Sequence, residues 1–167
     1  FAVHEVVSLY LINLVINMIV APLLGHVVHR FGERNTLLFE YTGLCLVFLA
    51  YGGIYMFGWG VVLAATLYVI DHIFFGLALA LKTYFQKIAD PRDIAPTAAV
   101  AFTINHIAAV GLPASLGYLW LVSPTAVFML AAAMAAVSFG LAMMIPRHPE
   151  EGNETIFSKF TAAAPAE

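Results

Sequence analysis

Five long apolar stretches make up most of this chain, and they restrict it to very few folds. The stretches run approximately over residues 6–29, 36–57, 60–81, 97–121 and 125–145. As helices with a rise of about 1.5 Å per residue, such segments span the hydrocarbon core of a bilayer, which is about 30 Å thick. Because lipid cannot satisfy backbone polar groups, the stretches predict an all-α, polytopic membrane protein with about five transmembrane helices.

The composition favours this class and excludes others. The chain is 62% hydrophobic and 10% charged, whereas soluble domains carry about 25% charged residues. With so little charge, a soluble fold would expose large apolar patches and aggregate. The single cysteine, Cys45, rules out an internal disulfide framework. The basic residues are too few and too dispersed for a nucleic-acid surface, so the expected partner is the lipid bilayer.

The lysine and arginine residues all follow the first, third or fifth stretch: Arg30, Arg34, Lys82, Lys87, Arg92, Arg147 and Lys159. The breaks near residues 57–60 and 122–125 carry none. Since cytoplasmic loops retain Lys and Arg, this alternation predicts a multi-pass protein of the cell (inner) membrane with a cytoplasmic C-terminus. We expect residues 1–146 to form the membrane bundle and residues 147–167 to form a disordered cytoplasmic tail.

The loop after the first stretch carries a recognisable motif. From residue 25 it reads Gly-His-Val-Val-His-Arg-Phe-Gly-Glu-Arg. This resembles the loop signature of the major facilitator superfamily, Gly-x-x-x-Asp-Arg-x-Gly-Arg-Arg/Lys. Gly25, Arg30, Gly32 and Arg34 fall on the pattern, whereas a histidine replaces its Asp and Glu33 replaces a basic residue. Gly25 would let two helices approach closely, and Gly32 would supply a turn conformation that other residues resist.

The resemblance implies a place and a role for this loop. A degenerate signature is similar to the weaker copy in the second half of such transporters, where the five stretches would be helices eight to twelve. They would form most of one six-helix bundle, in the C-terminal piece of a longer polypeptide whose N-terminal bundle is missing. In the family this loop is a latch that holds one conformation. The alternative is that Arg30 and Arg34 only anchor the topology. Glu40 is a candidate acidic partner of Arg30.

Polar residues near the middle of three stretches are the candidate site: Asn13, Asn17, Asp71, His72, Asn105 and His106. An ionisable group at the centre of a membrane helix costs about 2.5–3.5 kcal/mol or more, so these residues are candidates for a substrate or proton pathway. Alternatively, they tie helices together by hydrogen bonds. Tyr68, Phe75 and Phe102 lie within a turn of them and could stack on an organic substrate, although most aromatic residues in membrane helices simply pack. Under the resemblance, the helices that carry the six polar residues line the central cavity.

The expected function is transmembrane transport of a small-molecule substrate by alternating access, as an ion- or proton-coupled secondary transporter. The alternative is a non-transporting structural or sensor subunit with the same fold. We expect no enzyme activity and no cofactor, because no nucleophile has a paired base and no phosphate-binding glycine loop is present. His26 and His29 lack a third ligand nearby, so no metal site is expected.

Overall fold

The computed structural model describes residues 3–158, and residues 1–2 and 159–167 lie outside this description. Within the described part the chain forms six helices and no β-strand: α1 (Val3–Phe31), α2 (Glu33–Phe57), α3 (Val61–Gly76), α4 (Leu79–Ile88), α5 (Pro91–Val122) and α6 (Pro124–Met143). Five segments are long and apolar enough to cross a membrane, namely α1, α2 as far as Ile54, α3 together with α4, α5, and α6. The all-α class with five candidate membrane-spanning segments is therefore confirmed.

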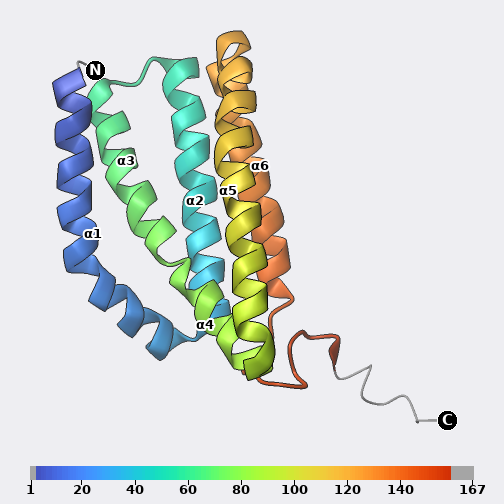
Figure 1. Ribbon diagram of the computed structural model, residues 1–167. Helices are drawn as coiled ribbons and strands as arrows, with labels where there is room; N and C mark the ends of the chain where they lie inside the picture. Colours follow the sequence, from blue (N-terminus) through green and yellow to red (C-terminus); the bar gives the residue numbers. More distant parts are fainter. Residues whose placement is uncertain (1–2, 159–167) are drawn as a thin grey trace.

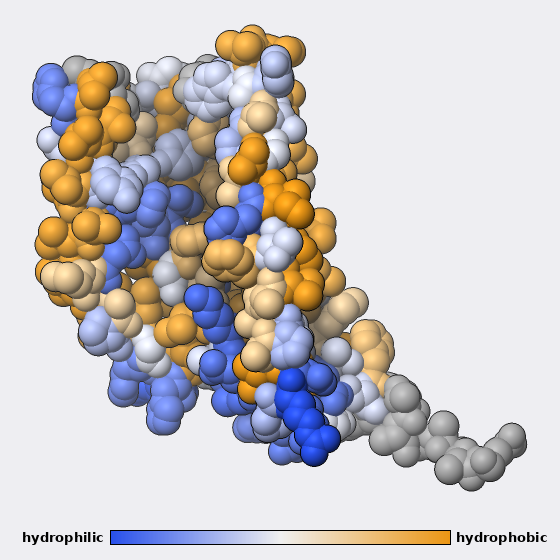
Figure 2. Space-filling view, viewed as in Figure 1, coloured by the Kyte–Doolittle hydropathy of each residue, from blue (hydrophilic) through white to orange (hydrophobic). Residues whose placement is uncertain are grey.

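The helices run up and down the molecule, so their ends gather at two opposite faces (Figure 1). One face of the molecule, which we call the basic end, holds the end of α1, the start of α2, the whole of α4, the start of α5 and the segment just after α6. Every Lys and Arg of residues 3–158 lies in these segments, and Figure 2 shows hydrophilic residues there. The turns at residues 58–60 and 123 lie at the opposite face. Along the sequence, the alternation of basic residues corresponds to this separation in space.

The most extensive helix contact joins α2 to α6, and small side chains make it possible. Ala132 and Ala135 of α6 are buried, and the Sγ of Cys45 on α2 lies 3.7 Å from the carbonyl oxygen of Ala132. Small residues let backbones approach closely, which is how helices associate in lipid. α5 packs on α6 and, in contrast, has no buried residue. The bundle therefore has a tight centre and a loosely attached flank.

Two helices begin earlier than the apolar stretches suggest. α2 begins at Glu33 after Gly32, whose φ of 79° lies in the left-handed region, so the turn expected at this glycine is confirmed. α5 begins at Pro91, because the Asp90 side chain accepts a hydrogen bond of 2.8 Å from the backbone N–H of Arg92 and caps the helix. These polar first turns lie at the basic end, and apolar content alone does not reveal them.

The third stretch is a broken helix rather than the continuous one expected over residues 60–81. α3 ends at Gly76 and α4 begins at Leu79. Between them the N–H of Leu77 donates to Phe74 O at 2.9 Å and the N–H of Ala78 donates to Phe75 O at 3.1 Å, so the chain tightens to three-residue turns. A Cβ at Gly76 would stand 2.5 Å from Cδ1 of Leu24 on α1. The break therefore lies in close contact with Leu24 of α1.

The segment after α6 folds back on the bundle. In place of the disordered tail predicted from residue 147 onward, residues 147–158 form turns against α4 and α6. The N–H of Ile156 donates to Met144 O at 2.9 Å, and the Tyr84 hydroxyl on α4 donates to Glu154 O at 2.5 Å. These two bonds fasten the segment to both helices. The rest of the predicted tail, residues 159–167, lies outside the described residues.

Candidate functional site

Two polar pairs lie at the same level on neighbouring helices. Asn13 on α1 and Asp71 on α3 each stand ten residues after the start of their helix (13 − 3 and 71 − 61), or about 15 Å along it. α1 and α3 run in the same direction and pack together. Figure 2 shows hydrophilic residues in a recess beside α1 at mid-height, among apolar ones. Asn13 and Asp71 therefore stand at a similar height on α1 and α3.

The asparagine pair is held on one face of α1. Asn13 is 3% exposed, and the Nδ2 of Asn17 donates to its backbone oxygen at 2.9 Å and to its Oδ1 at 3.0 Å. Oδ1 of Asn17 lies 3.9 Å from where a Cβ at Gly76 would stand. The two amides therefore form one unit that faces the break in the third span, with the Asn17 oxygen nearest to it.

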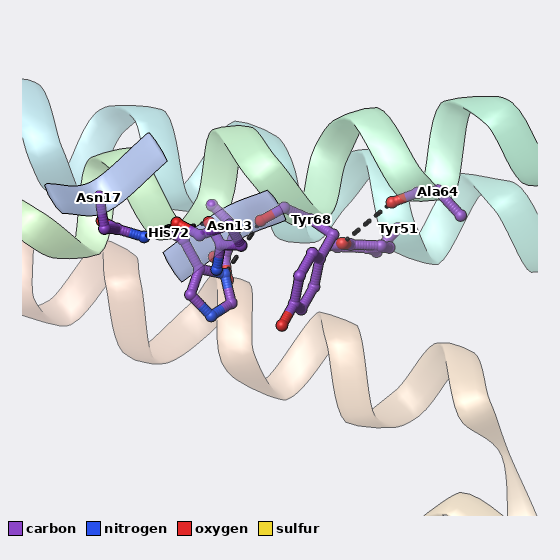
Figure 3. A network of polar contacts seen from close by, with 7 residues as sticks. Asn13, Asn17, Tyr51, Ala64, Tyr68 and His72 are labelled. Carbon is purple, nitrogen blue, oxygen red and sulfur yellow. Dashed lines mark hydrogen bonds and ion pairs between the residues drawn. The ribbon is translucent and has the colours of Figure 1, made fainter. Parts of the chain in front are cut away.

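The second pair, Asp71 and His72 on α3, joins an acid to an imidazole, and Figure 3 shows His72 beside Tyr68. The Nδ1 of His72 lies 3.7 Å from Oδ2 of Asp71 and 2.9 Å from the carbonyl oxygen of Tyr68. A carbonyl can only accept, so Nδ1 carries the proton and Nε2 is the ring atom left to bind a ligand or to accept a second proton. The ring of Tyr68 lies over that of His72, with centroids 4.4 Å apart.

The third predicted pair stands apart from the other two. Asn105 and His106 lie near the middle of α5 but are exposed. The Nδ1 of His106 contacts Phe102 O at 2.9 Å, and the Phe102 ring lies 3.9 Å from the imidazole. Within residues 3–158 no hydrogen bond or ring contact joins Asn105 or His106 to α1 or α3. The structure thus groups four of the six predicted residues and leaves two on the flank.

An aromatic pocket of about 290 Å³, which the sequence did not reveal, lies beside the polar pairs. We define it by its lining residues, Val6, Leu9, Tyr51, Ile54, Ala64, Ala65, Tyr68, Trp120 and Phe128. The rings of Tyr51 and Phe128 stack at 4.9 Å, and Trp120 meets Phe128 edge-on at 5.7 Å. Of the three aromatic residues expected to stack on a substrate, Tyr68 lines this pocket, whereas Phe75 and Phe102 are largely exposed outside it.

The loop at the basic end carries a different contact from the one expected. Gly25 has nothing within 4 Å of the position that a Cβ would take, so the close helix approach predicted there is wrong. The guanidinium of Arg30 lies 5.8 Å from the Phe31 ring centre. Glu33, the residue that departs from the signature, forms an ion pair of 2.6 Å with Lys87 on α4. The loop is therefore tied to the third span through Glu33 and Lys87.

Glu40 is a buried acid without the partner proposed for it. Its side chain is 2% exposed, and its Oε2 has no hydrogen-bond partner in the part of the chain that the structure describes. The prediction that Glu40 pairs with Arg30 is wrong, because no ion pair joins them within residues 3–158. A buried carboxyl with an unpaired oxygen lowers the stability of the fold. Glu40 is therefore expected to destabilise the bundle.

The chain matches no protein-family model, no curated protein and no solved structure. The fold and the site together define an all-α protein with five candidate membrane-spanning segments and a polar cluster at mid-height.

Proposed function

We propose that this chain forms part of the solute pathway of a secondary transporter of the major facilitator type. The solute would pass through a cavity bordered by Asn13, Asn17, Asp71 and His72, by alternating access and with coupling to an ion or proton. The observation that carries the proposal is the placement of these four residues beside the broken third span. Transporters commonly build their substrate sites near the bilayer midplane, next to discontinuous helices.

The energetics support a functional role for this cluster. Asp71 and His72 lie about 15 Å inside a candidate span, where ionisable groups are costly and seldom serve packing alone. Asp71 lies 3.7 Å from His72, so its carboxylate would stabilise the imidazolium formed when Nε2 accepts a proton. That exchange supplies the coupling step. The exposed Asn105 and His106 would border the same pathway from α5 in a conformation that brings α5 closer.

The loop at the basic end supports a two-state cycle. Gly32 makes the turn, and the ion pair of Glu33 with Lys87 joins α2 to α4. Opening this end would separate the two helices and break the pair, so we assign the latch to Glu33 and Lys87, with Gly25, Arg30 and Arg34 shaping the loop. By the retention of basic residues in the cytoplasm, we place this end in the cytosol and the protein in the cell (inner) membrane.

Labelling of Asn17→Cys tests alternating access without knowledge of the solute. The natural full-length polypeptide, with Cys45→Ala and no other cysteine, is placed in vesicles of both orientations and treated with an impermeant maleimide. We expect labelling from both sides, since the site would open to each in turn. Val15→Cys, exposed on the same helix, is the control for lipid-facing positions. Labelling of Asn17→Cys from one side only would instead support the non-transporting structural or sensor subunit.

A further inference from the structure

The aromatic pocket combines four rings from four helices in one partly enclosed space. Tyr51 comes from α2, Tyr68 from α3, Trp120 from α5 and Phe128 from α6. The face of an aromatic ring is the negative end of its quadrupole and attracts cations, most strongly for tryptophan. The rest of the lining is aliphatic. A ligand of this pocket therefore has an apolar body and is favoured by positive charge.

The charges around the pocket are all of one sign. We considered every residue that lies within four sequence positions of a lining residue. The charged residues in this set are Glu5 and Asp71, and both are acidic. The other titratable groups within the same sequence distance are two histidines and five tyrosines: His4, His72, Tyr10, Tyr51, Tyr55, Tyr68 and Tyr118. Lys and Arg of the described residues stand at the basic end, away from these segments. This set of residues contains no Lys or Arg that would repel a bound cation.

A continuous set of contacts joins the pocket to Asp71. Tyr68 lines the pocket, its ring lies 4.4 Å from that of His72, and His72 lies 3.7 Å from Asp71. Figure 3 shows the Tyr68 and His72 rings projecting from α3 to the same side. A cation held over Tyr68 would therefore lie close to the only carboxylate of α3, and it would replace the imidazolium as the partner of that carboxylate.

We propose that the aromatic pocket binds a small organic cation, an ammonium compound with an aromatic or branched apolar body, whose charge is balanced by Asp71. This assigns a substrate class to the proposed transporter and rests on that proposed function. The volume of about 290 Å³ suits a single compact molecule of this kind. Because the cation and the proton on His72 compete for one carboxylate, binding of the cation favours release of the proton.

Equilibrium binding of labelled phenyltrimethylammonium to the natural full-length polypeptide in lipid nanodiscs tests the proposal. Empty nanodiscs give the background from partition into lipid. tert-Butylbenzene has the same shape without the charge, and serves as the neutral competitor. We expect saturable binding of the cation and at least about tenfold weaker competition by the neutral compound, in line with a desolvated cation–ring and cation–carboxylate interaction.

Variants separate the two parts of the site. Phe128→Leu and Asp71→Asn should each weaken binding of the cation about tenfold, whereas Tyr68→Phe keeps the ring and should keep the affinity. Phe102→Leu, on an exposed ring of α5 outside the pocket, is the matched control and should leave binding unchanged. Thermal unfolding of each purified variant in the same nanodiscs verifies that it is folded, so that a loss of affinity is assigned to the pocket.

The results of the binding and labelling experiments test the preference for a cation, the pocket as a ligand site and transport separately. Equal competition by tert-butylbenzene, or undiminished binding by Asp71→Asn, would overturn the preference for a cation. Absence of saturable binding in the folded wild-type protein would overturn the pocket as a ligand site. If binding fails while Asn17→Cys is labelled from both sides, transport stands and the substrate class is wrong. If binding holds while labelling is one-sided, the site stands and transport is wrong.

Discussion

The Nζ of Lys87 on α4 lies 2.6 Å from Oε1 of Glu33, at the first residue of α2. The two partners differ in their access to water, because the Glu33 side chain is 4% exposed and that of Lys87 is 53% exposed. A lysine that loses its partner can be solvated, whereas the buried carboxylate cannot. The two ends of this ion pair are therefore not equivalent.

This asymmetry predicts unequal effects of substitution. Lys87→Met should lower the free energy of unfolding by about 1–3 kcal/mol, since it leaves a buried acid unpaired. Glu33→Gln should cost less than about 1 kcal/mol, since Lys87 turns to solvent. Unfolding of the purified variants by added sodium dodecyl sulfate, monitored by circular dichroism, measures both. Equal losses, or a larger loss for Glu33→Gln, would contradict the burial of Glu33.

A second prediction compares two glycines of the bundle. Gly76→Ala should destabilise the protein by about 1–3 kcal/mol, because the new methyl group stands 2.5 Å from Leu24. Gly25→Ala should stabilise it by about 0.5–1 kcal/mol, because it meets nothing within 4 Å and adds helix propensity.

The double variant Leu24→Ala with Gly76→Ala checks the cause. If the clash with Leu24 is responsible, the cost of Gly76→Ala measured in the Leu24→Ala background should fall close to zero. An unchanged cost in that background would place the strain elsewhere in the break.

Effects of this kind depend on contacts between helices, which a pattern within one segment does not reveal. The five spans and the collection of basic residues at one end could be predicted, because segment length and the retention of Lys and Arg act on each segment separately. The break after Gly76 depends on Leu24 of another helix, and no pattern within the third stretch reports it. A signal was present only in the glycine itself, which is rarely placed without reason in a helix.

The candidate site divides in the same way. Asn13, Asn17, Asp71 and His72 could be found because polar groups are conspicuous in apolar stretches. The aromatic pocket could not, because its lining residues come from five helices and look individually like packing residues. The Glu33–Lys87 pair was not predicted, because Glu33 departs from the signature and the expected roles were assigned to Arg30 and Arg34, which match it.

A third prediction concerns Glu40. Glu40→Met keeps the volume of the side chain and removes a buried oxygen without a partner, so it should stabilise the fold by about 1–3 kcal/mol. Leu44→Met, a buried position one turn further along α2, controls for the effect of a flexible apolar side chain. Detergent unfolding compares the two. A loss of stability specific to Glu40→Met would mean that the carboxyl has a partner in the membrane.

A fourth prediction follows from Glu154 in the segment after α6. Hydrogen bonds from its own backbone N–H, from the Ser158 hydroxyl and from the Gly152 N–H lower the pKa of this carboxyl below its ordinary value of 4.5. Because the folded pKa is depressed, the turn is favoured above pH 4.5 and loses this contribution as the pH falls through the folded pKa. Amide hydrogen exchange at Gly152 should therefore accelerate in acid beyond its intrinsic pH dependence.

Glu154→Gln is the control for this acid effect. It cannot titrate, so exchange at Gly152 in this variant should follow only the intrinsic pH dependence of amide exchange. The same excess acceleration in Glu154→Gln would assign the acid effect to another carboxyl, such as Glu150 or Glu151.

The flank formed by α5 has a consequence for how this protein can exist in a bilayer. Acyl chains offer no hydrogen bonds, so the carboxamide of Asn105 and the imidazole of His106 would be left dry if hydrocarbon covered them. Either a column of water or a further proteinaceous wall must border this side of α5. The α5 flank, which has no buried residue, is therefore the side where water or further helices would contact the bundle.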